Sequence, residues 1–303
     1  MEQLLIGIGD LHGHYPALEK ILYRLQEQYS IFSDNMVLQQ EVNIVFTGDY
    51  IDRGSQSLKI INTLKTLQSN NTRIHTLFGN HELLALSDAS NAANALTYDD
   101  RSLDMYRQTV HGNNGGVAFV QEFASTPKEA MRSYVQRISR EGDVGLWIRK
   151  LKPLVLQEQY GKKILFVHGG IPKTMNSVKD LEAYAQQFSS HMSTNSTSLG
   201  KEQKYREHPL VGGHSVFWDR ELPYRGEHDP SYARNTAARI GVDYIVIGHT
   251  PQEKITMFGN CVFDIDVGMT PAYGEREPCA IIFKKTGVYD FGVEHGERIM
   301  IEH

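Results

Sequence analysis

The sequence predicts an α/β fold in which β-sheets are flanked by helices. Short runs that are apolar almost throughout recur along the chain, and between them stand segments with apolar residues at helical spacing. Near-continuous apolarity indicates strands buried on both faces, and the alternation of strand and helix is typical of α/β proteins. After Gly259 the pattern changes to short strands divided by Gly and Pro. We interpret this tail as an antiparallel meander that completes a second sheet.

The elements follow in order along the chain. Strands are predicted at 4–8, 43–46, 73–78, 163–167 and 244–247, and the strands of the tail at 262–266, 280–284, 288–291 and 298–302. Helices are predicted at 17–28 and 57–67, where leucines and isoleucines recur on one face. Ligands of α/β sheets gather beyond the carboxyl ends of strands, so the residues that follow each strand are the candidates for a site.

Two segments stand apart from this alternation. Residues 83–159 are predicted to form a mainly helical insertion, with one helix at 127–140, and two roles stay open for it: a structural cap and a wall that selects substrate. Residues 188–200 are rich in Ser and Thr, which predicts an exposed loop. The motifs described below run from Asp10 to His249, so we expect residues 1–303 to form a single domain.

Composition excludes several classes of protein. The chain has 303 residues, 40% hydrophobic and 22% charged, as in ordinary soluble globular proteins. A net charge of −5 gives no basic footprint for nucleic acid. The two cysteines form no disulfide framework, the first residues resemble a strand and not a signal peptide, and no run reaches the ~20 apolar residues that span a membrane. We therefore expect a cytoplasmic protein that binds neither nucleic acid nor membrane.

Five short motifs stand directly after the five predicted strands. Glycine accompanies a carboxylate, imidazole or amide in each, and this mixture of ligands suits divalent metals such as Mn, Fe or Zn. A single such motif carries little weight, but the order of all of them is specific. The motifs are Gly9-Asp10-Leu11-His12-Gly13, Gly48-Asp49-Tyr50-Ile51-Asp52-Arg53-Gly54, Gly79-Asn80-His81-Glu82, His168-Gly169-Gly170 and Gly248-His249-Thr250.

These motifs resemble the phosphoprotein phosphatase family of metallophosphoesterases, and they span most of the chain. Trp218-Asp219-Arg220 and the run 265–274 are similar to its bacterial-type branch, the Shewanella-like phosphatases and their relatives related to diadenosine tetraphosphatase. The resemblance implies a calcineurin-like metallophosphoesterase fold, a β-sandwich flanked by helices with a mainly helical insertion. It also implies two divalent metal ions, with Mn preferred and Fe or Zn as alternatives, which activate a shared hydroxide as the nucleophile.

The same resemblance assigns metal ligands residue by residue. One ion would be held by Asp10 and His12, and Asp49 would bridge the two ions. The ligands of the second ion would be Asn80, His168 and His249. Glu82, the last residue of its motif, is expected to make a buried structural hydrogen bond and no metal bond.

The remaining motif residues are assigned to chemistry on the substrate. His81 would be the general acid that protonates the leaving oxygen, and Asp52 would accept its hydrogen bond. Arg53 would bind phosphate oxygens with its planar fork, together with Asn80. Arg220 is the preferred second phosphate-binding arginine and Arg225 its rival. For the histidines outside the motifs we expect solvated or packed roles: His14, His75, His111, His191, His208, His214, His228 and His295.

The function implied is a protein phosphatase that hydrolyses phosphomonoesters of phosphoproteins, serine and threonine esters before tyrosine esters. One alternative is a symmetrical dinucleoside polyphosphate hydrolase acting on diadenosine tetraphosphate, and another is a catalytically silent module that keeps metal for structure. Neither cysteine has Arg six residues later, which excludes the loop of cysteine-dependent tyrosine phosphatases, and no P-loop motif occurs. The expected partner is a phosphorylated protein or peptide, and the oligomeric state stays open.

Overall fold

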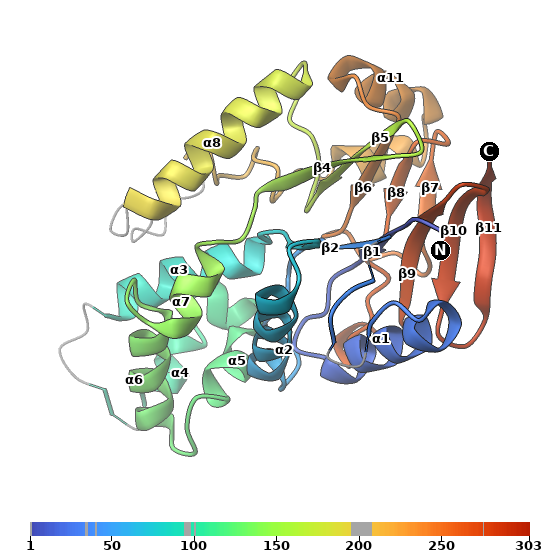
Figure 1. Cartoon of the computed structure of the whole chain (residues 1–303). Helices are drawn as coiled ribbons and strands as arrows, with labels where there is room; N and C mark the ends of the chain where they lie inside the picture. Colours follow the sequence, from blue (N-terminus) through green and yellow to red (C-terminus); the bar gives the residue numbers. More distant parts are fainter. Residues whose placement is uncertain are drawn as a thin grey trace.

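Two β-sheets pack face to face at the centre of the protein, and helices cover their outer sides (Figure 1). The computed structural model describes residues 2–33, 36–39, 41–93, 98–99, 101–194, 208–274 and 276–303. The six-stranded sheet has the order β11-β10-β9-β1-β2-β3, and the five-stranded sheet has the order β4-β5-β6-β8-β7. Phe166 and Phe283 meet across the interface with ring centroids 6.3 Å apart, so the core lies between the sheets. The predicted α/β fold is confirmed.

The strands are β1 (Leu4–Ile8), β2 (Val42–Phe46), β3 (Ile74–Thr76), β4 (Leu154–Gln159), β5 (Lys162–Val167), β6 (Tyr244–Ile247), β7 (Thr256–Phe258), β8 (Val262–Asp264), β9 (Cys279–Lys284), β10 (Gly287–Gly292) and β11 (Gly296–Glu302). The sequence located the first strands because their side chains are buried on both faces, as in β1 and β6, where every residue is buried. β1, β2 and β3 pair in parallel, as do β5 and β6. The carboxyl ends of these strands therefore point to the same side of the sandwich.

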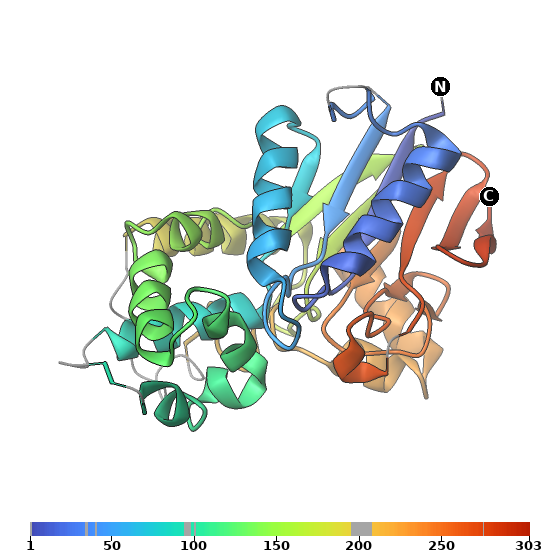
Figure 2. The same cartoon turned by 90° about the horizontal axis from the view of Figure 1, so that it is seen from below.

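The helices are α1 (Tyr15–Tyr29), α2 (Ser57–Asn70), α3 (Asn80–Ala92), α4 (Ser102–Tyr106), α5 (Val117–Gln121), α6 (Pro127–Ile138), α7 (Asp143–Ile148), α8 (Val178–Thr194), α10 (Glu221–Gly226) and α11 (Pro230–Ile240). Gly112–Gly116 form a π-helical turn and Pro271–Tyr273 a 3₁₀ turn. Figure 2 shows α1 and α2 lying along the outer face of the first sheet. In α1 the residues that reach the core are Ala17, Leu18, Ile21 and Leu25, the face that the sequence pattern predicted. Among the described residues, no helix is both long and apolar enough to cross a membrane.

Three predictions about the sequence organisation need correction. The insertion is helical only to Ile148, and the last residues of the predicted 83–159 segment form β4, which pairs with β5. The tail does not complete a second sheet by itself: β8 joins β6, whereas β9, β10 and β11 extend the first sheet from β1. The predicted loop 188–200 begins inside α8, where Phe188 is buried, and its part beyond 194 lies outside the described residues. Local composition does not show which sheet accepts a strand or which helix face finds a partner.

Candidate metal and phosphate site

The predicted ligands converge at the carboxyl ends of strands from both sheets. Asp10 and His12 follow β1, Asp49 follows β2, and Asn80 opens α3 shortly after β3. The motifs after β5 and β6 contribute His168 and His249 from the other sheet. All of these side chains are buried. The two halves of the site are joined directly, because the backbone N–H of His249 donates to Asp10 Oδ2 at 3.0 Å.

The glycines of the motifs are needed because carboxylates pass against the bare backbone. A Cβ added to Gly79 would lie 2.1 Å from Asp49 Oδ1, and one added to Gly248 would lie 2.3 Å from Asp10 Oδ1. No side chain fits at either position. The recurrence of glycine beside each candidate ligand thus has a steric cause.

Asp49 lies at the centre of the site. Its Oδ2 is 3.6 Å from His12 Nε2, 3.9 Å from His81 Nε2 and 3.4 Å from His168 Nε2. Two groups of residues have ligand atoms close enough together to hold a metal ion, His12–Asp49–His81 and Asp49–His168–His249, and Asp49 belongs to both. This is the position expected of a bridging ligand.

Asp10 and Asn80, the other predicted ligands, contact residues of these two groups. The Asp10 carboxylate accepts from the Thr47 hydroxyl at 3.3 Å, and its Oδ2 from the backbone of His249. The amide of Asn80 meets His168, with Oδ1 2.9 Å from Nε2. The geometry is compatible with the predicted ligand set, whose roles stay predictions.

Hydrogen bonds to backbone carbonyls leave the ligating nitrogens unprotonated. His12 Nδ1 donates to Ile51 O at 3.1 Å, and His168 Nδ1 donates to Thr47 O at 2.9 Å. A carbonyl can only accept, so in the neutral ring the Nε2 of each imidazole presents a lone pair toward Asp49. His249 Nε2 is buried and has no hydrogen-bond partner in the part of the chain that the structure describes. Lone pairs that face a carboxylate, beside an unsatisfied imidazole nitrogen, are the arrangement that a bound cation satisfies, and this donor set fits divalent metals.

The electrostatics of the centre agree with this arrangement. Burial lowers the pKa of His12 well below its usual value, with help from Arg53 and His81. Burial acts to raise the pKa of Asp49, but positive charge on His168 and His81 outweighs it and holds that pKa well below its ordinary value, and a cation bound by the neutral rings would supply charge of the same sign. Neutral imidazoles and an ionised carboxylate are the forms that bind metal.

Two further buried carboxylates, Asp264 and Asp266, adjoin the site and were not predicted. Burial, together with Asp266 and Asp49, raises the pKa of Asp10 well above its ordinary value, and burial raises the pKa of Asp266 to about 6. Among the described residues, Asp266 Oδ2 has no hydrogen-bond partner. So much buried acidic charge needs compensation by cations. The signal that could have found these residues is an Asp-x-Asp sequence at the end of an apolar strand.

Beside the metal centre, Asp52 and His81 form the predicted pair. His81 Nδ1 lies 2.6 Å from Asp52 Oδ2, and Asp52 is fully buried. Arg53, the next residue, donates from Nη2 to His81 Nε2 at 3.1 Å and from Nη1 to His12 Nε2, while its guanidinium lies 4.8 Å from the ring centre of Tyr273. Arg53, which is partly exposed, thus contacts both imidazoles.

Asp52 has a second imidazole partner that sequence reasoning missed. His111 Nε2 lies 2.8 Å from both carboxylate oxygens of Asp52, and the ring is fully buried. We expected a solvated or packed role because no motif surrounds His111. Only the glycines at 112, 115 and 116, which follow it inside a helical segment, indicate a turn in close contact with another part of the chain.

The structure separates the two candidate arginines. Arg220 Nη1 donates to His249 O and to Thr250 Oγ1, both at 3.0 Å, so it lies against one of the metal motifs. Arg225 is exposed, pairs with Glu221 at 3.6 Å and stacks over Tyr232. Glu82 takes the predicted structural role, because it accepts from the backbone N–H groups of Asp49 and Tyr50.

Several of the predicted ligands and catalytic residues have strained backbone conformations. Positive φ angles in the left-handed region occur at His12 (41°), Asp49 (51°), Asp52 (73°), Arg53 (65°) and His249 (71°). Each such residue costs of order 1–3 kcal/mol, which surrounding contacts must offset, and this kind of strain gathers at active sites and ligand clamps.

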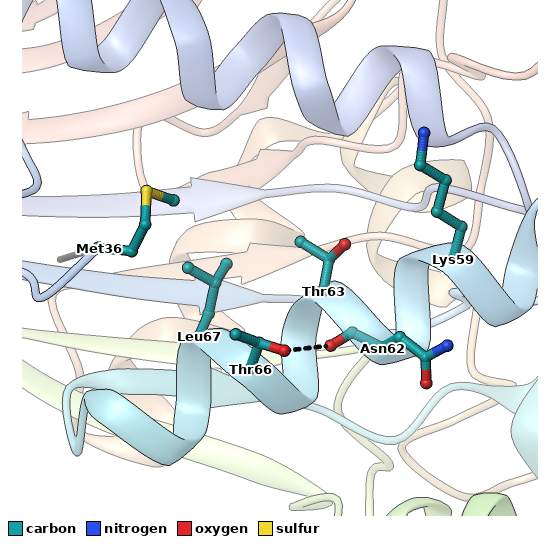
Figure 3. Close-up of a pocket in the computed structure, with 6 residues that line it drawn as sticks. All are labelled: Met36, Lys59, Asn62, Thr63, Thr66 and Leu67. Atoms are coloured by element: carbon teal, nitrogen blue, oxygen red, sulfur yellow. Dashed lines mark hydrogen bonds between the residues drawn. The ribbon is translucent and has the colours of Figure 1, made fainter.

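A cavity of about 460 Å³ lies elsewhere, along one face of α2 and beside Met36 (Figure 3). Its lining consists of Met36, Lys59, Asn62, Thr63, Thr66 and Leu67. None of the candidate site residues borders it.

Comparisons with known proteins complete the description. Residues 4–253 match the family model described as calcineurin-like phosphoesterase. A symmetrical bis(5'-nucleosyl)-tetraphosphatase of Actinobacillus succinogenes is 27% identical over 163 residues, 48% of this chain and 54% of that protein. The serine/threonine-protein phosphatase BSL2 of Arabidopsis thaliana is 26% identical over 181 residues, 57% of this chain and 13% of that protein. The matched part of this chain thus spans about half the length of the first relative and a small part of the second.

Among solved structures, a cold-active protein-tyrosine phosphatase of a psychrophilic Shewanella species superposes with a TM-score of 0.69 at 18% identity, covering 99% of this chain and 81% of that one. A protein serine/threonine phosphatase from Saccharomyces cerevisiae superposes with a TM-score of 0.51 at 13% identity, covering 99% and 82%. At these identities the likeness concerns the fold.

Proposed function

The chain belongs to the calcineurin-like phosphoesterase family, and from this premise we propose that it is a metal-dependent phosphatase that hydrolyses phosphate monoesters of phosphoproteins. The observation that carries the proposal is the pair Asp52–His81 beside Asp49: a buried carboxylate holds an imidazole whose Nε2 lies 3.9 Å from Asp49 Oδ2. A module that held metal only for structure would need no oriented imidazole at this place.

The residues that would hold two divalent ions are Asp10, His12, Asp49, Asn80, His168 and His249, with Asp49 shared. Ions in such a set would supply Lewis-acid polarisation of phosphoryl oxygens and acidify a water. The buried carboxylates and the unprotonated nitrogens described above support this assignment.

His81 would donate a proton to the leaving oxygen. Because Asp52 accepts from Nδ1, the other ring nitrogen, Nε2, is the one that can carry a proton to substrate. In the structure, the guanidinium of Arg53 donates a hydrogen bond to that nitrogen. An incoming phosphate would compete for the guanidinium of Arg53, and His81 Nε2 would then face the leaving oxygen.

Arg53 and Arg220 would bind the phosphate oxygens that the ions do not reach, together with Asn80. A guanidinium matches two oxygens with a planar pair of donors. Arg53 approaches the centre from the side of His12, and Arg220 from the side of His249. The phosphate would therefore be held between two cationic side chains and the metal centre.

Serine and threonine esters are the proposed substrates before tyrosine esters. Their alkoxides leave much less readily than a phenolate, so a built proton donor contributes most to their hydrolysis. The runner-up is symmetrical hydrolysis of diadenosine tetraphosphate, favoured by the 27% identity to the Actinobacillus succinogenes tetraphosphatase.

One assay tests the proposal against the runner-up. The purified protein is given Mn²⁺ and tested on phosphoserine, phosphothreonine and phosphotyrosine peptides and on diadenosine tetraphosphate, with Asp49→Asn as the control for contaminating activity. We expect the highest kcat/KM on phosphoserine or phosphothreonine peptides. A strong preference for the dinucleotide would establish the runner-up, and no turnover of any substrate would leave a silent metal-binding module.

We also propose that the bound metal is manganese and that the protein is located in the cytoplasm. Metal analysis of protein purified without added metal and fractionation of the native cell are the measurements that decide them.

A further inference from the structure

His111 contacts the proposed catalytic pair from the helical insertion. Asp52 accepts from His81 at one oxygen, and His111 Nε2 lies within 2.8 Å of both. A carboxylate with a single partner can rotate about its Cβ–Cγ bond, whereas a second donor that contacts both oxygens restricts this rotation. Asp52 also has a φ of 73°, so its backbone does not hold this conformation by local preference.

Hydrogen bonds and close packing hold His111 in place. Its backbone N–H donates to Asp88 Oδ2 at 3.0 Å. Its Nδ1 meets the hydroxyl of Tyr106 and lies 3.2 Å from that of Tyr134, which donates to Ala85 O at 3.0 Å. A Cβ at Gly116 would lie 2.6 Å from the ring, so glycine leaves the room that the imidazole fills.

Two of the residues that hold His111 and Tyr134 in place belong to α3, the helix that carries His81. Ala85 and Asp88 are four and seven residues beyond His81 in α3, and residues at these spacings share one face of a helix. The contacts form a closed ring from His81 to Asp52, to His111, to Asp88 and back along α3. The insertion therefore braces the face of α3 from which His81 projects.

The turn after His111 also supports Arg53. Gly115 O accepts from the backbone N–H of Arg53 at 3.1 Å. Both residues of the Asp52-Arg53 pair are thus held from the same turn, by a side chain in one case and by the backbone in the other.

We propose that His111 is a positioning residue for the phosphatase reaction, which fixes Asp52 so that Asp52 holds the ring of His81 toward the leaving oxygen. The inference rests on the proposed function for its kinetic consequence. It gives the insertion a role beyond those of cap or substrate wall, because the insertion supplies part of the support of the proton donor.

The first test needs no activity. The ring N–H that His81 shares with Asp52 should give a downfield, slowly exchanging proton resonance in the metal-free protein, assigned by its loss in His81→Asn. His111→Leu should shift this resonance and speed its exchange, whereas His111→Gln, whose amide can still donate to Asp52, should retain it. An unchanged resonance in His111→Leu would overturn the proposal whatever the protein hydrolyses.

The second test uses leaving groups. With Mn²⁺ bound, His111→Leu should lower kcat on an alkyl phosphate by about 10- to 100-fold and on p-nitrophenyl phosphate by much less, with KM unchanged, because only the alkoxide needs the proton. In a His81→Asn background the same substitution should add little, since both residues act through one proton donor.

Phe119→Leu is the matched control, because Phe119 is buried in the same insertion and packs 6.0 Å from the ring of Tyr134 without a polar contact to Asp52. It should lower the melting temperature and leave the dependence on the leaving group unchanged. Equal losses on both phosphates in His111→Leu, or full additivity with His81→Asn, would assign His111 a structural role only. Absence of wild-type turnover would count against the proposed function, while the resonance test would still decide the role of His111.

Discussion

The carboxylate of Asp52 holds His81 through a hydrogen bond of 2.6 Å to Nδ1, in a position where neither side chain is exposed to solvent. This relationship joins the loop after β2 to the start of α3. It leaves the other ring nitrogen of His81 on the side of Asp49 and Arg53, where a phosphorylated substrate would bind. The predictions that follow test the groups around this pair.

His81→Asn should lower kcat on alkyl phosphates by about 10²–10⁴-fold, the usual contribution of a positioned general acid. The loss should be smaller on p-nitrophenyl phosphate, because nitrophenolate leaves without a proton. Metal content, measured by elemental analysis, should stay near that of the wild type. Equal losses on the two substrates would point to a ligating or structural role for His81.

Asp49→Asn should abolish turnover more completely than Asp10→Asn, because Asp49 alone belongs to both groups of candidate ligands. Its metal content should fall for both ions, whereas loss of a ligand that serves one ion should spare the other. Chelation of the wild type should remove activity, and Mn²⁺ should restore it. Full activity in a metal-free preparation would contradict the metal mechanism.

Arg53→Ala should damage KM and kcat on every phosphorylated substrate, and Arg220→Lys should stay impaired although it keeps its charge, because lysine lacks the paired planar donors of arginine. Arg225→Ala is the matched control. Arg225 lies in the short helix α10, where its guanidinium pairs with Glu221 and stacks over Tyr232 instead of contacting a candidate ligand. Steady-state kinetics on one phosphopeptide compares the three. A larger defect in Arg225→Ala than in Arg220→Lys would reverse the assignment.

Gly115→Ala should impair phosphate binding, and Gly161→Ala should not. Both glycines have positive φ, 100° and 74°, so alanine costs roughly 1–2 kcal/mol at either position. A Cβ at Gly115 would also lie 2.7 Å from Arg53 Cγ, whereas a Cβ at Gly161 meets nothing within 4 Å. Urea unfolding measures the shared loss of stability, and KM for a phosphopeptide the effect that only Gly115 should show. Equal KM values for the two variants would show that this turn does not support phosphate binding through Arg53.

Asp52 should make stability depend on pH in the acid range. Burial acts to raise its pKa, but His111 and His81 lower it from 3.8 to about 2. The folded pKa lies below the unfolded one, so the ionised carboxylate stabilises the fold above pH ~4, and this contribution disappears as the pH falls from ~4 to ~2. In urea unfolding of the metal-free protein, the difference between wild type and Asp52→Asn should shrink by about 1 kcal/mol between pH 7 and pH 3. A difference that does not change with pH would show that the two imidazoles do not favour the ionised form.

A deletion in the insertion that removed Asp88 would not test substrate choice alone. Asp88 belongs to α3 and accepts the backbone N–H of His111, so its removal would release His111 from the turn. A change confined to the entrance would have to spare α3.

The sequence by itself determined the architecture around β1, β2, β3, β5 and β6 and the residues that follow these strands. Strands buried on both faces are visible as apolar runs, and parallel strands place their carboxyl ends at one edge, so a motif after each run predicts a shared site. The contact of His81 with Asp52 was implied by the resemblance of their motifs to those of metallophosphoesterases, and the structure shows it. The glycines beside the ligands were visible in the sequence, but the atoms that require them, such as the Asp49 carboxylate at Gly79 and the Asp10 carboxylate at Gly248, are seen only in the structure.

Only the tertiary structure decided the rest. His111, Asp264 and Asp266 reach the site through packing of segments far apart in the chain, and the glycines after His111 and the Asp-x-Asp sequence do not by themselves show which residues these side chains contact. The fold also brings Arg220 against the loop of His249, whereas Arg225 pairs with Glu221, and the phosphate-binding role of Arg220 stays a prediction. The tail strands divide between two sheets, because β9 pairs with the edge of β1 and β8 pairs with the edge of β6. The assembled core sets these pairings, and the composition of the strands does not.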